Sequence, residues 1–130
     1  MGIAFFALYA FTACPTIFWK DSAEFVAVAH FLDVAHPAGS PAYALLAKLL
    51  SLLPISDIAG RVNLFSSLTA AAAVSILFLL CREALLAAET PPGRAALLAA
   101  GAAAAFGLGA PFWILAATAE VYPLATCFFA

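Results

Sequence analysis

Charged side chains are scarce in this sequence. Of its 130 residues 9% are charged and 67% are hydrophobic, whereas a soluble domain is about one quarter charged and one half apolar. A soluble fold of this length would need far more polar surface, so the composition predicts an integral membrane protein. The five basic residues form no block and the net charge is −2, which excludes the electrostatic footprint of a nucleic-acid-binding protein.

Basic residues are also missing before the first apolar stretch, which argues against a secretory signal peptide and favours a first membrane span. A myristoylation signal is disfavoured by Phe6, which stands where Ser or Thr is required. The three cysteines, Cys14, Cys81 and Cys127, lie in or beside apolar runs, where a thiol packs as a small hydrophobe. Cys14 and Cys127 fall at one predicted membrane face, but an odd count does not establish a disulfide.

Four apolar runs predict an all-α fold, a polytopic transmembrane helical bundle. A span needs about 20 apolar residues, and the predicted spans cover residues 3–19, 58–81, 95–117 and, cut short, 123–130. Phe18 and Trp19 close the first run, as aromatic residues do at the headgroup level. We therefore expect residues 1–130 to be the N-terminal fragment of one larger transmembrane domain.

The basic residues suggest an orientation. Arg82 and Arg94 flank the short connection between the second and third spans, which favours this connection as cytoplasmic. The long loop 20–57 and the tight turn around Glu120 then share the outer face, which is periplasmic, extracellular or lumenal.

The long loop contains two predicted short helices. Asp21 can cap a helix whose third position is Glu24, an acidic variant of the capping box. Ser40 as N-cap and Pro41 at the first helical position start a second helix of about 13 residues, which Pro54 stops. Leucines cover most of its surface, which predicts a helix lying at the membrane interface.

Most ionisable side chains fall on this predicted outer face. Asp21 and Glu24 lie three residues apart, so both carboxylates can accept or orient a hydroxyl proton; the alternative is a helix cap. His36 lies in a Pro-Gly turn and can donate to a phosphate or hydroxyl, or instead bond the backbone of the turn. His30 and Asp33 fit a solvated helical pair and are not candidates.

Two further positions carry candidates. Arg61, with Asn63 beside it, lies just inside the outer end of the second span, where a charge indicates a site; the alternative is a pair with Asp57. Glu120 has a neighbouring phenol, Tyr122, and no obvious ion-pair partner nearby in sequence. These residues lack a metal-ligand spacing such as His-x-x-x-His, so no metal site is predicted.

Five short segments together resemble one family. They are Pro15-Thr16, Trp19-Lys20-Asp21-Ser22-Ala23-Glu24-Phe25, His36-Pro37-Ala38-Gly39-Ser40-Pro41, Arg61-Val62-Asn63-Leu64 and Ala119-Glu120-Val121-Tyr122. In this order they resemble the protein O-mannosyltransferase-like membrane family of the GT-C glycosyltransferases, over nearly the whole chain. Ala38 stands where the family often has a second proline and Ala23 where glycine is common, and neither change removes a functional group.

The resemblance implies a polytopic enzyme that uses a polyprenyl-phosphate sugar, with its active site at the outer face and an essential acid in the first loop. Asp21 matches that acid by position, and Glu24 is the second predicted catalytic residue. The predicted substrate-binding residues, for acceptor, sugar and lipid phosphate, are His36, Arg61, Asn63, Glu120 and Tyr122.

The expected reaction is a single displacement that moves mannose or a related hexose to a hydroxyl of a protein or glycan acceptor. It needs a base for the hydroxyl proton, here Asp21, and a group that stabilises the departing phosphate. The Arg61 guanidinium matches phosphate oxygens bidentately. The scheme requires no cofactor, and a divalent metal is compatible with it. Such enzymes have many more spans, so we expect this fragment alone to be inactive.

Two other classes also fit the sequence. A transporter would place Glu120 and Arg61 near the bilayer midplane beside broken helices, whereas a transferase places them at the outer interface. A non-catalytic scaffold would use Asp21 only as a helix cap.

Overall fold

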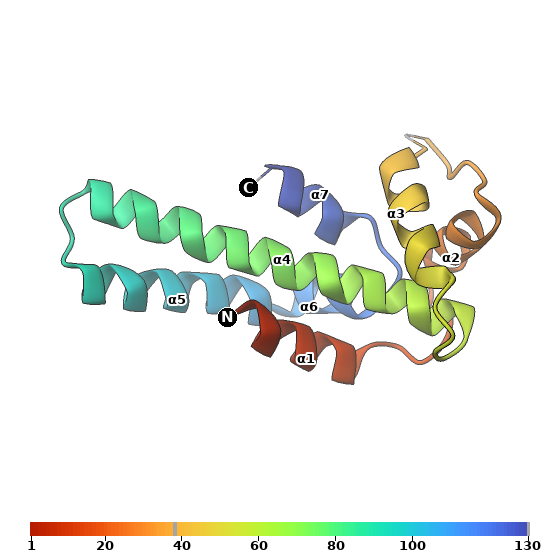
Figure 1. Ribbon diagram of the computed structural model, residues 1–130, viewed down its shortest axis with the longest axis horizontal. Coiled ribbons are helices and arrows are strands. Elements are labelled where there is room, and N and C mark those ends of the chain that lie inside the picture. Colours follow the sequence, from red (N-terminus) through yellow and green to blue (C-terminus); the bar gives the residue numbers. More distant parts are fainter. Residues whose placement is uncertain (38, 130) are drawn as a thin grey trace.

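The chain is all-α over the residues that the structure, a computed structural model, describes, which are 1–37 and 39–129. These residues form seven helices: α1 (Gly2–Thr12), α2 (Ser22–Phe31), α3 (Pro41–Ser51), α4 (Ile58–Ala87), α5 (Pro92–Leu108), α6 (Ala110–Ala117) and α7 (Tyr122–Phe129). Figure 1 shows α4 and α5 as an antiparallel pair along an elongated molecule, with α2 and α3 gathered at one end. The predicted all-α class is confirmed.

Helix α4 is the main membrane candidate. Its first turn is capped by Asp57, whose Oδ1 accepts a hydrogen bond of 2.6 Å from the backbone N–H of Gly60. With 30 residues it is about 45 Å long. Within the described chain it is the one unbroken helix that is long and apolar enough to cross a membrane. The predicted span 58–81 begins at the right residue, and the helix continues to Ala87.

The predicted third span, 95–117, is instead two helices. Helices α5 and α6 meet at a bend of 66°. At Gly109 the backbone leaves the helical region, with ψ 128°. Pro111 then has no N–H to donate, and in a straight helix its ring would clash with the carbonyl group of Gly107. Taken together the pair is long and apolar enough for one bent span.

The predicted first span is shorter than expected. Helix α1 ends at Thr12, so it is about 17 Å long, against a hydrocarbon thickness of about 30 Å. Beyond it the Cys14 N–H bonds the Ala117 carbonyl oxygen at 2.8 Å, and Pro15 has no N–H to continue the helix. At the other end of the sequence α7 begins at Tyr122, and Ala130 of the predicted fourth span lies outside the described residues.

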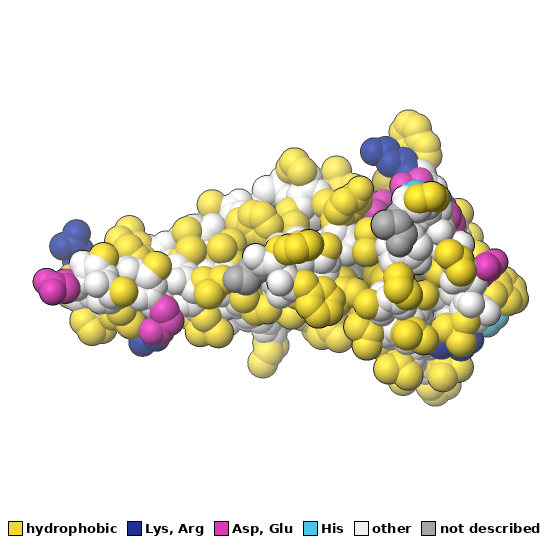
Figure 2. All heavy atoms as spheres, turned by 90° about the horizontal axis from the view of Figure 1, so that it is seen from above, with side chains coloured by type: hydrophobic (Ala, Val, Ile, Leu, Met, Phe, Trp, Pro, Cys, Tyr) yellow, Lys and Arg dark blue, Asp and Glu magenta, His cyan; other side chains and the backbone are white. Residues whose placement is uncertain are grey.

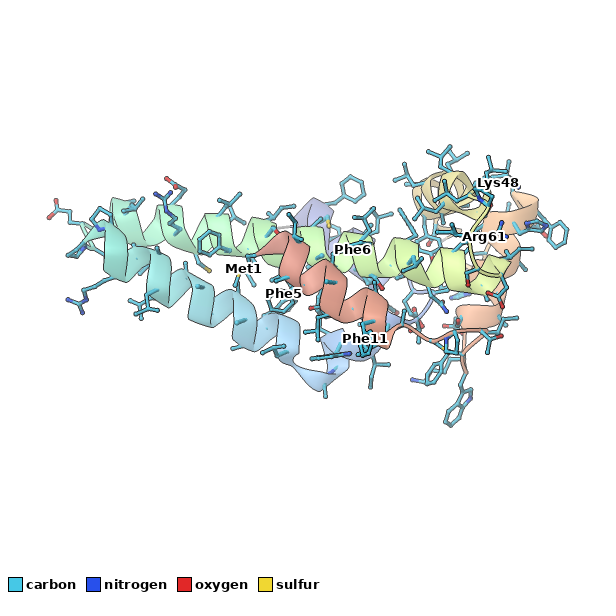
Figure 3. All side chains as sticks on the ribbon, turned by 60° about the horizontal axis from the view of Figure 1, so that its bottom comes forward. Met1, Phe5, Phe6, Phe11, Lys48 and Arg61 are labelled. Carbon is cyan, nitrogen blue, oxygen red and sulfur yellow. The ribbon has the colours of Figure 1, made fainter. Side chains whose placement is uncertain are left out.

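Both predicted loop helices are present. Helix α3 begins at Pro41 as expected and ends at Ser51, before Pro54. Its buried side faces α2 and α4, and Lys48 donates to the carbonyl oxygen of His30 in α2 (Figure 3). Its opposite side exposes a row of leucines: Leu45, Leu46, Leu49, Leu52 and Leu53. Leucines therefore cover the exposed side of α3, as the sequence indicates.

Close packing in the middle of the bundle depends on Gly107 of α5. The Tyr9 hydroxyl of α1 donates to its carbonyl oxygen at 2.8 Å. A Cβ at this position would lie 2.6 Å from a Phe5 ring carbon and 2.9 Å from both the Tyr9 hydroxyl oxygen and a Val74 methyl carbon. Helices α1, α4 and α5 therefore meet at a point that has no room for a side chain.

Gly107→Ala is accordingly expected to destabilise the full-length protein by about 1–2 kcal/mol, because the added methyl group forces the three helices apart. The measurement is the Tm in detergent. Gly101 is the matched control, since a Cβ there meets no heavy atom within 4 Å, and Gly101→Ala should leave the Tm unchanged or raise it. Equal Tm values for the two variants would contradict this packing.

Candidate functional site

An acidic cluster lies at the end of the molecule formed by α2, α3 and the connection between α6 and α7. We use this name for Asp21, Glu24 and Glu120 with the neighbouring Lys20 and His36. The charges of Asp21, Lys20 and His36 all act on the pKa of Glu120, and those of Asp21 and Glu120 act on His36. In Figure 2 acidic, basic and histidine side chains gather over this end, at the opposite end from the charged α4–α5 turn.

Asp21 directly precedes α2 and is exposed. The predicted capping box is wrong, because its side chain makes no cap hydrogen bond and its backbone is already helical, with φ −75° and ψ −7°. Its backbone oxygen accepts the first helical hydrogen bond, from the Phe25 N–H at 3.0 Å. Among the described residues the Asp21 carboxylate therefore has no structural partner and is available for chemistry.

Glu24 is bound by the turn that precedes α3. Its Oε1 accepts from the His36 backbone N–H at 2.5 Å, and its Oε2 lies 2.8 Å from Nδ1 of the His36 ring. The turn closes with a 2.8 Å hydrogen bond from the Gly39 N–H to the His36 carbonyl oxygen. Gly39 has φ +80°, a conformation that favours glycine. His36 thus pairs with Glu24, a contact that neither reading of the turn had predicted.

The contact between Glu24 and His36 shifts the pKa of both groups. Hydrogen bonds from the His36 backbone and ring lower the pKa of Glu24. The hydrogen bond to Glu24, followed by its charge and those of Asp21 and Glu120, raises the pKa of His36. The contribution of Glu24 to stability is therefore present above its ordinary pKa of 4.5 and lost as the pH falls through the lowered value. The contribution of His36 to stability is present below its ordinary pKa of 6.5 and is lost as the pH rises through its raised pKa.

Glu24→Gln is expected to bring the pKa of His36 down towards its ordinary value, because the amide carries no negative charge. The measurement is an NMR titration of the full-length protein with labelled histidine rings. Asp33→Asn is the matched control, since the Asp33 carboxylate is exposed and bonds the Val34 N–H instead. An unchanged His36 midpoint in Glu24→Gln would show that the pair does not persist in solution.

Glu120 lies between α6 and α7 and is buried, with 7% of its surface exposed. Its backbone N–H donates to the Ser66 hydroxyl oxygen of α4 at 3.1 Å, and the same hydroxyl lies 3.2 Å from the Glu120 carbonyl oxygen. Its Oε2 is buried without a hydrogen-bond partner among the described residues. Burial, and secondly the charge of Asp21, raises the pKa of Glu120, so this acid holds its proton more tightly than an exposed glutamate does.

The Arg61 side chain contacts backbone groups outside the acidic cluster. Its guanidinium donates to the backbone oxygens of Ser51 at 2.7 Å, Ile55 at 2.6 Å and Ser56 at 2.9 Å. Figure 3 shows Arg61 at the end of α4 that carries α3. The alternative pair with Asp57 is also absent among the described residues, because that carboxylate caps α4. Arg61 thus fastens the end of α3 to the start of α4.

Asn63 and Tyr122 also lie outside the cluster. Asn63 is fully buried, and its Nδ2 donates to the backbone oxygens of Cys14 at 2.7 Å and Thr16 at 3.0 Å. It fastens the segment between α1 and α2 to α4. Tyr122 is 59% exposed and lines a separate hollow on α7 with Thr126 and Phe129.

Lys20 is the functional candidate that sequence reasoning missed. Its charge lowers the pKa of Glu120, and the effect places it within electrostatic reach of the cluster. Its backbone is left-handed, with φ 63°, which is uncommon for a residue other than glycine. The available signal was its position directly before Asp21.

Comparison with known proteins decides the family. A profile of the family described as "Protein O-mannosyl-transferase TMEM260 N-terminal domain" matches residues 21–130. The chain belongs to this family. The match begins at Asp21 and includes every candidate residue named above except Lys20. The resemblance inferred from the five short segments is thereby confirmed.

A relative from mouse supports the same assignment. The chain is 42% identical over 73 residues to mouse "Protein O-mannosyl-transferase TMEM260". The alignment covers 55% of this chain and 10% of the mouse protein, so the match spans about a tenth of the curated relative. No solved structure matches the chain.

Proposed function

We propose that this chain is the N-terminal part of a polytopic GT-C glycosyltransferase that moves mannose or a related hexose from a polyprenyl-phosphate donor to a hydroxyl of a protein or glycan. The family supports the transfer of mannose to a hydroxyl oxygen. The observation that carries the proposal is Asp21, an exposed carboxylate with no hydrogen bond among the described residues. It stands beside a buried second acid, Glu120.

The charges on α4 support a placement in the membrane. Arg61 and Arg82 are 21 residues apart, about 32 Å along a helix, which matches a hydrocarbon thickness of about 30 Å. The hydrocarbon then lies between them, with α5–α6 as a bent second span. The acidic cluster, α2 and α3 lie at the Arg61 end, on the outer face, and the Arg82–Arg94 turn is cytoplasmic.

This placement favours transfer over transport. The 66° bend between α5 and α6 is a feature that a transporter would share. Glu120, however, is bonded to Ser66 in the third turn of α4. The charged residues that act on the pKa of Glu120, namely Lys20, Asp21 and His36, all belong to the long loop 20–57. Ser66 is five residues from Arg61, about 8 Å along the helix, so Glu120 lies in the outer half of the membrane rather than at the midplane.

The chemistry follows from the cluster. Asp21 accepts the proton of the acceptor hydroxyl while the oxygen of that hydroxyl forms the bond to C1 of the sugar. The bond between C1 and the phosphate oxygen breaks, and polyprenyl phosphate leaves with the electron pair. Lys20 takes the role expected of Arg61, because its positive charge acts on Glu120 whereas the Arg61 guanidinium bonds backbone oxygens. Glu24 holds His36 through Nδ1, and the protonated ring, which the raised pKa favours, can donate from Nε2 to the phosphate.

The experiment is a comparison of two mannose donors. Full-length protein in detergent is supplied with labelled polyprenyl-phosphate mannose or labelled GDP-mannose, together with a peptide rich in serine and threonine and a glycan acceptor. We expect label on the acceptors from the lipid-linked donor alone, and none with the 130-residue fragment. Transfer only from the nucleotide sugar, or from neither donor by a folded protein, would refute the proposal.

A further inference from the structure

Two polar atoms near the acidic cluster are buried without a hydrogen-bond partner among the described residues. They are the hydroxyl oxygen of Tyr43, a residue that is 1% exposed, and Oε2 of Glu120, which is 7% exposed. Buried polar atoms are nearly always paired, and an exception calls for an explanation such as a catalytic role. Tyr43 belongs to α3 and had no place in the predicted site.

Ser66 of α4 connects the two. Its hydroxyl contacts both the backbone N–H and the carbonyl oxygen of Glu120. The Ser66 hydroxyl is also close enough to the Tyr43 hydroxyl to lower the pKa of Tyr43, which the charge of Glu120 raises, although no hydrogen bond of good geometry joins the two hydroxyl groups. Three separate elements, α3, α4 and the α6–α7 connection, thus direct polar groups to one buried position.

Aromatic packing holds Tyr43 in this orientation. Its ring lies 5.1 Å from that of Phe25 in α2 and 5.3 Å from that of Phe65 in α4, both edge to face. Phe25 in turn lies 6.0 Å from the His36 ring. Such pairs stabilise a fixed ring geometry, so Phe25 of α2 and Phe65 of α4 hold the Tyr43 phenol in one orientation.

We propose that Tyr43 is a positioning residue for Glu120: guided by Ser66, its hydroxyl donates to the Glu120 carboxyl in the substrate complex and fixes the direction of that carboxyl. The inference rests on the proposed function of the acidic cluster. Catalytic hydrogen bonds are often long in the free enzyme and tighten when substrate binds. A hydrogen bond from the Tyr43 hydroxyl to the Glu120 carboxyl would pair both buried atoms at once.

Groups from several elements act on the pKa of Glu120. Burial raises its pKa, and so does Asp21, whereas Lys20 and His36 lower it. From α3 the neutral phenol of Tyr43 faces it, and from α4 the Ser66 hydroxyl. Loss of a hydrogen-bond donor disfavours the carboxylate form, so removal of the Tyr43 hydroxyl should raise the pKa of Glu120 further in the substrate complex.

The first test needs no activity. In full-length protein with a non-hydrolysable polyprenyl-phosphate mannose analogue bound, the carboxyl stretch that Glu120→Gln removes from the infrared difference spectrum is titrated in wild type and in Tyr43→Phe, which keeps the aromatic packing. We expect the midpoint to rise by about half to one pH unit in Tyr43→Phe. Tyr9→Phe is the matched control, because this buried phenol bonds Gly107; its midpoint should equal that of wild type. Equal midpoints in all three would overturn the inference.

The second test is kinetic and separates the inference from the proposed function. Transfer from labelled polyprenyl-phosphate mannose is measured for wild type, Tyr43→Phe, Tyr9→Phe and Asp21→Asn. We expect Tyr43→Phe to lower kcat about tenfold, the factor of one ordinary hydrogen bond, with KM within about twofold. If Asp21→Asn abolishes transfer while Tyr43→Phe matches wild type, the inference fails and the proposed function stands. If Asp21→Asn retains transfer, the assignment of Asp21 as the base fails, and if wild type itself transfers no mannose from this donor, the proposed function fails.

Discussion

Asp21→Asn is expected to lower transfer from polyprenyl-phosphate mannose by about 10²- to 10⁴-fold, the usual contribution of a general base. The amide has nearly the shape of the carboxylate but accepts no proton. Folding should be unaffected, because the Asp21 side chain makes no cap hydrogen bond. The measurement is the transfer rate together with the Tm, both on full-length protein.

Asp33→Asn is the control for this change. Asp33 follows α2 at its other end, and its carboxylate is exposed and bonds only the neighbouring Val34 N–H among the described residues. It should transfer mannose as wild type does. If Asp21 has only a scaffold role, Asp21→Asn should lower the Tm and reduce the transfer rate in proportion. If Asp21→Asn transfers mannose at the wild-type rate, Asp21 is not the base.

Asn63→Ala is expected to destabilise the full-length protein by about 2–4 kcal/mol, measured as a lowered Tm. The change removes two hydrogen bonds, to the Cys14 and Thr16 carbonyl oxygens, and leaves a cavity at a fully buried position. Because the released segment leads directly to Lys20 and Asp21, the transfer rate should fall along with the Tm.

Asn63→Asp sharpens the test. It is isosteric, yet it replaces the donor Nδ2 by an oxygen that faces two carbonyl oxygens, so it should lower the Tm at least as much as alanine does. A substrate-binding role makes the opposite prediction, namely a normal Tm and a raised KM for the donor. That outcome would restore Asn63 to the site.

The fold was predictable where hydrophobicity and turn residues determine it. The apolar run after Asp57 predicted the start of α4, and Ser40-Pro41 predicted the start of α3. The broken third span was not predicted, because a count of apolar residues does not register that Gly109 and Pro111 interrupt the helical hydrogen bonds. The end of the first helix was not predicted for a related reason, since the apolar run continues to Trp19 although the helix ends at Thr12.

The site was predictable in its grouping and less so in its contacts. Topology alone placed Asp21, Glu24, His36 and Glu120 on one face, and the structure brings them to one end of the molecule. The partners of Arg61 and Asn63 are backbone oxygens, which every residue carries, so no sequence pattern marks them. Glu24 was read as part of a capping box because its partner, His36, lies 12 residues away.

The most direct test of the central claim, that the acidic cluster is the sugar-transfer site, is a structure of the full-length protein with a non-hydrolysable polyprenyl-phosphate mannose analogue. We expect C1 of the sugar within reach of Asp21, the phosphate beside Lys20 and His36, and Glu120 directed at the sugar or acceptor. An analogue bound at another face of the bundle, with Asp21 still free of any contact, would contradict the account.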